Sequence, residues 1–183
     1  SLLINNFPET YSLYKEKYYT FNNIRQPNRN RLLWKDNSSD GVKTGHTESA
    51  GYCLISSAKR NDMRLIAVVA GAKSDKERFN DTQRLLEYGF RFYSTQEVIK
   101  KDNALKDVDV WGGKKNLVSL GAENNIKLTL PRTTFKNITI SYDFQNNLRA
   151  PIKEGQTLGT LVIKEGEKTL HTENLVALND VEA

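Results

Sequence analysis

Two apolar runs in the first half of the chain are separated by a short polar segment and predict neighbouring β-strands. The runs cover residues 51–58 and 63–71, and residues 59–62 between them are Lys-Arg-Asn-Asp. Two strands joined by so short a polar segment are most simply connected as an antiparallel hairpin. Because the second run is apolar almost throughout, we expect both of its faces to be covered.

A helix is predicted directly after these strands. Ser74 and Glu77 have the spacing of a capping box, in which the serine oxygen accepts a free amide hydrogen and the glutamate returns to the serine amide. One face then recurs at helical spacing, with Phe79, Thr82, Leu86, Phe90 and Tyr93. The helix is therefore expected to pack on the sheet and to end near Tyr93.

The stretches on either side of this strand and helix region have different patterns. Residues 11–21 mix aromatic and charged residues without a clear period, and we interpret them as extended structure with loops. Residues 36–41 are polar and predict a loop. Beyond residue 95 the chain changes to short alternating segments, and residues 160–164 and 168–172 flank Glu-Gly-Glu as in a hairpin. The second half is therefore predicted to be a small all-β domain.

Length and composition narrow the class of protein. The chain has 183 residues, of which 38% are apolar and 27% charged, enough for two small globular domains. No apolar run approaches the roughly 18 residues of a membrane-spanning helix, and the first residues lack a secretion signal, so any targeting segment is expected to lie outside this chain. One cysteine and two histidines exclude a disulfide scaffold and a structural zinc site.

Charge is distributed unevenly along the chain. Residues 1–95 carry 15 basic and 10 acidic side chains, whereas residues 96–183 carry 12 of each, and 13 of the 17 aromatic residues also lie in the first part. This difference indicates two structural units. The basic part suits nucleic acid, an acidic membrane surface or a carboxylate substrate, although a solvated, slightly basic surface explains it equally well. Because no nucleic-acid recognition signature accompanies the aromatic residues, we expect no nucleic-acid partner.

The most informative segment is Lys43-Thr44-Gly45-His46, directly before the first predicted strand. Alone, Lys-Thr-Gly arises by chance in about one of a dozen such chains. On an edge strand, however, it offers an ammonium group, a hydroxyl group and a position without a side chain where another backbone can approach. These three groups suit a peptide that lies along the strand and ends in a carboxylate.

Further segments extend this motif into a family resemblance. They lie at residues 21–26, 28–30, 40–47, 50–52, 62–66, 85–93, 110–113, 130–132, 148–151 and 156–160. In this order they resemble the D-alanyl-D-alanine carboxypeptidases among the low-molecular-mass penicillin-binding proteins. The resemblance implies an α+β fold. Residues 1–95 would be the closing part of a β-lactamase/transpeptidase-like catalytic domain, an antiparallel sheet with a packed helix, and residues 96–183 a small β-rich sandwich domain.

The resemblance also implies a nucleophile that this chain does not supply. The family takes its serine from a Ser-x-x-Lys helix start, followed by a Ser-x-Asn loop. Ser12 and Ser56 both begin a Ser-x-x-Lys match, but Ser12 is only 31 residues before Lys43, and Ser56 follows Lys43, which is the wrong order. Since no Ser-x-Asn occurs, we expect the nucleophile to lie on a missing N-terminal part of the same protein and this fragment alone to be inactive.

By the same resemblance, site roles fall on matching positions. Lys43 would place positive charge beside the acyl-transfer centre, Thr44 would bind the substrate carboxylate, and Gly45 would let the strand pair with substrate. The backbone N–H of His46 would be a second oxyanion donor, while a merely solvent-exposed ring explains its imidazole nearly as well as a site role does. Arg78 and Arg29 match basic residues near the carboxylate pocket, with an ordinary surface ion pair as the alternative for Arg78.

The implied function is that of a serine-type D-Ala-D-Ala carboxypeptidase. It would remove the terminal D-alanine from peptidoglycan stem peptides through an acyl-enzyme, be acylated by β-lactams, and need no metal or cofactor. The implied location is the bacterial periplasm, peripheral to the inner membrane through a C-terminal helix that lies outside this chain. Two alternatives stay open: a β-lactamase-like hydrolase, against which the long β-rich extension argues, and a non-catalytic cell-wall scaffold module.

Overall fold

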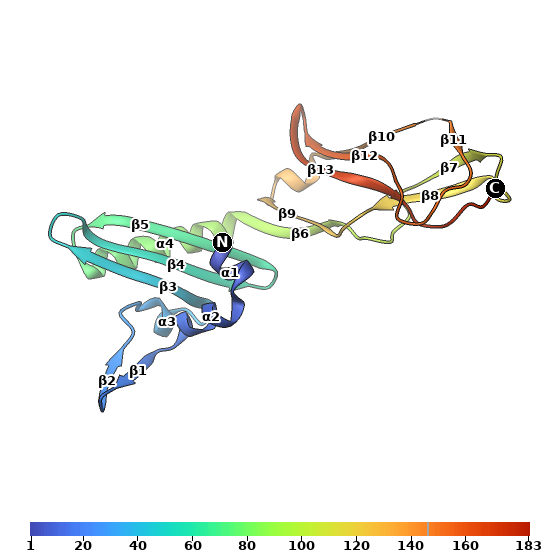
Figure 1. Ribbon diagram of the computed structural model, residues 1–183. Coiled ribbons are helices and arrows are strands. Elements are labelled where there is room, and N and C mark those ends of the chain that lie inside the picture. The colour runs from blue at the N-terminus through green and yellow to red at the C-terminus, as the bar shows by residue number, and fades with distance from the viewer. Residues whose placement is uncertain (146) are drawn as a thin grey trace. The chain divides into compact units, whose positions relative to one another are not determined.

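The computed structural model describes residues 1–145 and 147–183 and divides the chain into two compact units (Figure 1). Unit 1 is Ser1–Tyr93 and unit 2 is Ser94–Ala183. The division therefore falls close to the change in sequence texture after residue 95. None of the described helices is long and apolar enough to span a membrane.

Unit 1 is a three-stranded antiparallel sheet with one long helix and several short elements. In chain order it contains α1 (Leu2–Asn6), α2 (Pro8–Ser12), the 3-10 helix η1 (Leu13–Lys15), β1 (Tyr18–Phe21), β2 (Ile24–Pro27), α3 (Leu32–Lys35), β3 (Ser39–Thr47), β4 (Gly51–Arg60), β5 (Met63–Ala72) and α4 (Asp75–Phe92). The sheet order is β3-β4-β5, and β1 and β2 form a separate hairpin.

The predicted hairpin of the two apolar runs is confirmed. Arg60 pairs with Met63, which leaves a two-residue turn, and Asn61 in that turn has φ of 52°. A positive φ is required in the tight turns that join antiparallel strands, and asparagine tolerates it. The turn residues therefore match the geometry that the chain must adopt there.

The predicted helix is confirmed as α4. The Ser74 Oγ accepts a hydrogen bond from the Glu77 amide at 3.1 Å, while the Glu77 carboxylate accepts from the Lys73 amide at 2.5 Å and not from the Ser74 amide. Leu86 and Phe90 are buried, and they form one core with residues of the strands and of α3. These core partners are Leu32, Leu54, Ala58, Met63 and Ala67. The apolar face of α4 thus covers one face of the sheet.

The prediction that both faces of β5 are covered is wrong for the described chain. Met63, Ala67 and Ala72 are buried, but Ile66 and Val68, which point to the other face, are 42% and 61% exposed. An apolar run records a tendency to be buried, not the identity of the element that would bury it. In the residues that the structure describes, α4 covers only one face of β5.

Two predictions for the N-terminal region are also wrong. Residues 11–15, expected to be extended, are helical, because Pro8 begins α2 at a position that favours proline and Tyr11 packs inside unit 1. Residues 39–41, expected to be a loop, are the first part of β3. Ser39 pairs with Ala58 and Gly41 with Ser57 across a register irregularity, so pairing with β4 overrides the local turn composition.

Unit 2 is all-β, as predicted. It contains β6 (Tyr93–Ile99, whose first residue belongs to unit 1), β7 (Lys106–Trp111), β8 (Leu117–Ala122), β9 (Ile126–Pro131), the 3-10 helix η2 (Thr134–Lys136), β10 (Ile138–Phe144), β11 (Leu148–Arg149), β12 (Thr157–Glu165) and β13 (Lys168–Ala177). One sheet has the order β10-β12-β13-β8-β7-β11, and β6 pairs with β9. The predicted β12–β13 hairpin is confirmed, with Gly166 at φ of 56° in its turn.

The core of unit 2 comes from alternating strand positions, as a sandwich requires. Its fully buried side chains include Val118, Leu120, Leu161, Ile163 and Leu175. They belong to neighbouring strands of the larger sheet, and Ile126 of β9 joins the same cluster from the smaller pair. Unit 2 therefore has an independent hydrophobic core.

Candidate active site

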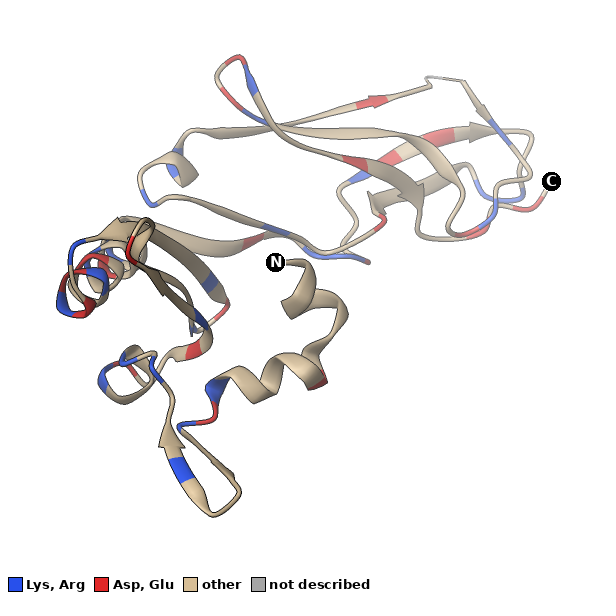
Figure 2. Ribbon diagram, turned by 60° about the vertical axis from the view of Figure 1, so that its left-hand side comes forward, with Lys and Arg blue, Asp and Glu red and all other residues tan. Residues whose placement is uncertain are grey.

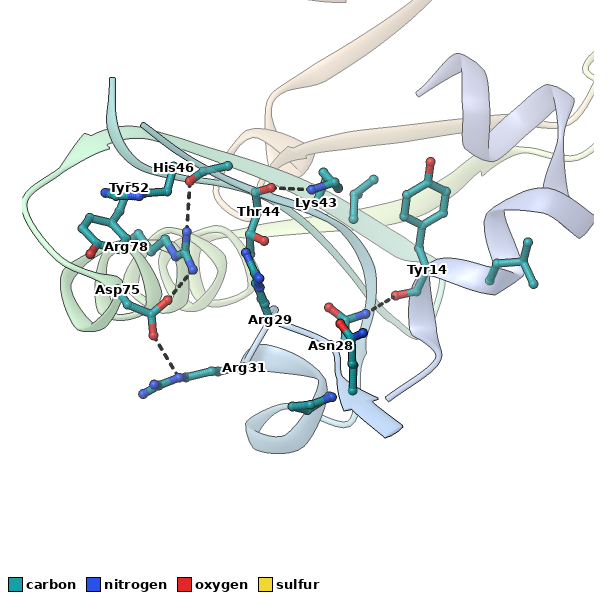
Figure 3. A pocket seen from close by; sticks show the side chains of 15 residues that line it. Tyr14, Asn28, Arg29, Arg31, Lys43, Thr44, His46, Tyr52, Asp75 and Arg78 are labelled. Atoms are coloured by element: carbon teal, nitrogen blue, oxygen red, sulfur yellow. Dashed lines mark hydrogen bonds and ion pairs between the residues drawn. The ribbon is translucent and has the colours of Figure 1, made fainter. Parts of the chain in front are cut away.

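A cleft of about 870 Å³ lies along β3 in unit 1 (Figure 3). Its lining includes all six residues that the sequence singles out, together with others from η1, β2, the loop before α3, β3, β4 and α4. These residues are Leu13, Tyr14, Gln26, Pro27, Asn28, Arg29, Arg31, Val42, Lys43, Thr44, Gly45, His46, Tyr52, Asp75 and Arg78. The Lys-Thr-Gly segment therefore lies on the wall of the cleft and not in the protein interior.

Strand β3 is an edge strand within the described sheet. Lys43 pairs with Ile55 and Gly45 with Cys53 on β4, and no other described strand pairs with the opposite edge of β3. A side chain at Gly45 would meet only the Cys53 Cβ, at 3.8 Å. The outer edge of β3 thus keeps backbone donors and acceptors available for an extended peptide.

Lys43 extends into solvent at this edge. Its Nζ donates a hydrogen bond to the Thr44 carbonyl oxygen at 2.7 Å, and none of the described carboxylates forms an ion pair with it. The ammonium group is therefore free to interact with a bound molecule. Thr44, the next residue, is half-buried.

Arg78 connects α4 to β3. Its side chain is buried, and Nη1 donates hydrogen bonds to the carbonyl oxygens of Gly45, at 3.0 Å, and Cys53, at 3.3 Å. The guanidinium lies 5.3 Å from the centre of the Tyr52 ring, and that ring lies 3.9 Å from the imidazole of His46. Arg78 thus sets the distance between the first turn of the helix and the Lys-Thr-Gly strand.

Asp75 joins two arginines of the cleft, as Figure 3 shows. Its carboxylate accepts from Arg78 Nη2 and forms an ion pair with Arg31 Nε at 2.9 Å. Sequence reasoning missed both Arg31 and Asp75. Arg31 is the second basic residue of the Asn-Arg-Asn-Arg turn, and Asp75 is an acidic residue in the first turn of a capped helix. Neither local pattern indicates that the two side chains pair with each other.

Asn28 and Asn30 hold the loop that carries Arg29. Asn30 is buried, and its side chain donates to the Gly41 carbonyl oxygen at 2.9 Å and accepts from the Leu32 amide at 3.2 Å. Asn28 accepts from the Asn30 amide at 3.0 Å. Because Gly41 belongs to β3, this turn is fastened directly to the strand that forms the cleft wall.

The cleft carries more positive than negative charge. Lys43, Arg29, Arg31 and Arg78 line it, and Asp75 is the acidic residue among its lining side chains. Such a cleft attracts an anion and strengthens hydrogen bonds to a carboxylate. The arrangement can therefore bind an extended peptide at the β3 edge and hold its terminal carboxylate.

Neither candidate serine of this chain lies in the cleft. Ser12 ends α2 and donates to the Glu9 carbonyl oxygen at 2.6 Å. Ser56 is fully buried on β4 and donates to the Gly41 carbonyl oxygen at 3.1 Å. Both hydroxyls thus donate hydrogen bonds to backbone carbonyl oxygens of unit 1.

Comparison with known proteins identifies similar sequences along the whole chain. Residues 1–74 match the family described as D-alanyl-D-alanine carboxypeptidase, and residues 93–183 match penicillin-binding protein 5, C-terminal domain. The chain is 47% identical over 182 residues to D-alanyl-D-alanine carboxypeptidase DacC of Escherichia coli, covering 98% of this chain and 46% of that protein. It is 42% identical to DacA of the same species over 182 residues, covering 98% of this chain and 45% of that protein.

A solved structure is similar over both units. The crystal structure of penicillin-binding protein 5 from Haemophilus influenzae aligns with a TM-score of 0.82 at 38% sequence identity, covering 100% of this chain and 54% of that chain. The chain spans about half the length of the curated relatives that it matches.

Proposed function

The chain belongs to the D-alanyl-D-alanine carboxypeptidases of the low-molecular-mass penicillin-binding protein family, and on that premise we propose that its parent protein is a serine-type D-Ala-D-Ala carboxypeptidase. The substrate is a peptidoglycan stem peptide ending in D-Ala-D-Ala. The observation that carries this proposal is the open edge of β3, where Lys43, Thr44 and Gly45 line a positively charged cleft.

The substrate backbone pairs with the outer edge of β3, where Gly45 leaves room for it. The Thr44 hydroxyl donates to the terminal carboxylate, and Arg29 and Arg78 supply the positive charge that attracts it. Lys43 stabilises negative charge at the reacting centre, and the His46 backbone N–H donates to the oxyanion. Each role uses an atom on the wall of the same cleft.

The reaction proceeds through an acyl-enzyme whose nucleophile is a serine on the part of the protein outside this chain. The serine oxygen bonds to the carbonyl carbon of the penultimate D-alanine, and the C–N bond to the last residue breaks. The serine proton passes to the leaving nitrogen, so D-alanine leaves with a neutral amino group. That amino group then takes up a proton from solvent. Water then hydrolyses the ester and restores the serine. This chain contributes substrate binding and oxyanion stabilisation to both steps.

A β-lactam acylates the same serine, because its carboxylate and strained amide occupy the positions of the peptide's carboxylate and scissile bond. We place the parent in the bacterial periplasm, peripheral to the inner membrane through a C-terminal helix. The family membership supports this location.

Acylation of the full-length parent by labelled penicillin tests the proposal, together with release of D-alanine from a model pentapeptide. We expect Lys43→Ala and Thr44→Val to lower the acylation rate by about 10²-fold or more. Lys168→Ala, at the exposed start of β13 in unit 2, is the control and is expected to react like the unmodified parent. A parent that neither reacts with penicillin nor releases D-alanine would refute the function. If it is acylated but the Lys43 and Thr44 variants react normally, the assigned roles are wrong.

A further inference from the structure

A second pocket of unit 1 lies between α3 and the first turns of α4. Its volume is about 400 Å³, which is within the size range of small-molecule sites. Its described lining combines two aromatic rings with three basic side chains and one amide, and Arg31 also lines the cleft at β3. The lining residues are Arg31, Trp34, Lys35, Lys76, Phe79 and Asn80, and we call this site the Trp34 pocket.

Both aromatic rings of the pocket are held by the packing of unit 1. Trp34 is 38% exposed, and its indole meets the Tyr18 ring edge to face, with 5.9 Å between the ring centres. Phe79 is half-buried and packs against the core cluster that contains Leu32 of α3 and Leu86 of α4. Because α3 and α4 share this core, the two walls of the pocket are in place before any ligand binds.

The two lysines of the pocket have free ammonium groups. In the part of the chain that the structure describes, neither Lys35 nor Lys76 forms an ion pair or a hydrogen bond through Nζ. Arg31 differs, because Asp75 pairs with it and also with Arg78. Lys76 lies in the first turn of α4, where the helix dipole disfavours a positive charge. Its position there does not serve the stability of the helix.

The acidic residues that adjoin the pocket in the sequence have other partners. In Figure 2, α4 carries acidic as well as basic segments. Each of three neighbouring carboxylates contacts a group outside the pocket. These contacts are Asp36 with Arg60 Nη2 at 2.9 Å, Glu77 with the Lys73 amide at 2.5 Å, and Asp81 with Arg84 Nη1 at 3.6 Å. The ammonium groups of Lys35 and Lys76 are therefore the donors that an anion in the pocket would meet.

We propose that the Trp34 pocket binds a small aromatic carboxylate. The ring of the ligand packs against Trp34 and Phe79 in the offset or edge-to-face arrangements that aromatic rings favour. The ammonium groups of Lys35 and Lys76 donate charge-assisted hydrogen bonds to its carboxylate. A concave site with aromatic walls and a few charged groups is typical of small-molecule sites, so the chemistry favours a small molecule over a protein surface.

Binding of 2-naphthoate to the full-length parent, measured by equilibrium dialysis, tests the proposal. 2-Naphthamide has the same rings without the negative charge, and acetate has the charge without the rings. We expect 2-naphthoate to bind about tenfold more tightly than either, because it alone uses both the aromatic walls and the lysines.

Variants with a matched control locate the bound probe. Lys35→Gln with Lys76→Gln should weaken the binding of 2-naphthoate about tenfold and leave that of 2-naphthamide unchanged. Lys17→Gln with Lys59→Gln replaces two exposed lysines of unit 1 that do not line the pocket, and should change neither. Trp34→Leu should weaken the binding of both aromatic probes, while circular dichroism stays that of the unmodified parent.

The cleft at β3 also attracts carboxylates, so Thr44→Val is a further control and should leave the binding of 2-naphthoate unchanged. The proposal is overturned if Thr44→Val weakens this binding as much as replacement of Lys35 and Lys76 does. It is also overturned if the two lysine pairs have equal effects, or if 2-naphthamide binds as tightly as 2-naphthoate. Because bound probe is measured, a failure of penicillin acylation in the unmodified parent would concern the proposed function alone.

Discussion

Arg78 Nη1 donates a hydrogen bond to the Gly45 carbonyl oxygen across 3.0 Å, and this contact joins α4 to the Lys-Thr-Gly strand. The two residues are 33 positions apart in the sequence. Because the same guanidinium also binds the Cys53 carbonyl and Asp75, the wall of the cleft depends on a side chain from the helix. Arg78 therefore has a structural role whether or not it contacts substrate.

Replacing Arg78 by glutamine in the full-length parent should lower both stability and acylation. The Gly45 and Cys53 carbonyls lose a charged donor, so we expect a loss of about 1–3 kcal/mol in the free energy of unfolding and a fall in acylation of tenfold or more. Arg78→Lys should be intermediate, since an ammonium group cannot reproduce the planar set of donors. Denaturant unfolding and labelled penicillin measure the two effects.

Arg84 on the same helix provides the control. Its side chain is 80% exposed and lies 3.6 Å from Asp81. Arg84→Gln should therefore change neither the free energy of unfolding nor the rate of acylation measurably. Equal behaviour of the Arg78 and Arg84 variants would show that the contact with Gly45 is unimportant.

Tyr11 predicts how the stability of unit 1 depends on alkaline pH. Burial raises the pKa of Tyr11 to about 12, the Asp40 carboxylate adds to the rise, and Ser57 and Arg64 oppose it. The neutral phenol donates to Asp40 at 2.7 Å. The stabilisation is therefore complete below the unfolded-state pKa of 10.0 and is lost as the pH rises towards 12.

Tyr11→Phe should isolate this effect. The variant should be less stable by about 1 kcal/mol at neutral pH, and the difference from the unmodified chain should diminish between pH 10 and 12. In an ultraviolet titration of phenol ionisation, the variant should lack the tyrosine that ionises at the highest pH in the unmodified chain. A variant whose titration still contains that late tyrosine would disprove the assignment to Tyr11.

Ser74 should stabilise the start of α4 through its side-chain oxygen. Ser74→Ala removes the acceptor for the Glu77 amide and should cost about 1 kcal/mol, whereas Ser74→Asp should retain most of the stability. Urea unfolding of the two variants decides the matter. If alanine and aspartate are equivalent, the cap contributes little.

Replacing Gly159 by alanine should destabilise unit 2, because Gly159 lies where β12 pairs closely with β10. A Cβ at this position would lie 2.3 Å from the Asp143 carbonyl oxygen and 2.7 Å from the Phe144 Cβ, and the backbone oxygen cannot move aside without breaking the strand pair. We expect Gly159→Ala to cost more than about 2 kcal/mol.

Gly166→Ala is the matched comparison for Gly159. Nothing lies within 4 Å of its Cβ position, and only its φ of 56° opposes a side chain, at a cost of about 1 kcal/mol. Thermal unfolding should therefore give Gly159→Ala a lower melting temperature than Gly166→Ala. The reverse order would contradict the crowding argument.

The elements that could be predicted from the sequence are those whose signal is local and repeated. The β4–β5 and β12–β13 hairpins have strong strands around short turns, and α4 combines a serine cap with three further turns of one buried face. The helices α1 and α2 have five residues each, too few to establish a period, and the burial of Tyr11 depends on contacts with β3. Their conformation is decided by tertiary packing.

The same distinction holds for the cleft. Lys43, Thr44, Gly45 and His46 are contiguous, so one motif places all four on one strand. Arg78 was reached only through the family resemblance, and the Arg31–Asp75 ion pair was missed, because it joins a loop to a helix start 44 residues later. Sequence periodicity carries no information about which separated loops come together.

The outer position of β5 affects how the isolated chain would behave in solution. Among the described strands β5 pairs only with β4, and its face away from α4 exposes Ile66 and Val68. Free backbone groups beside exposed apolar side chains favour the addition of a strand from a second molecule. We expect the 183-residue chain to aggregate through β5 when concentrated, and Val68→Lys to raise its solubility without unfolding it.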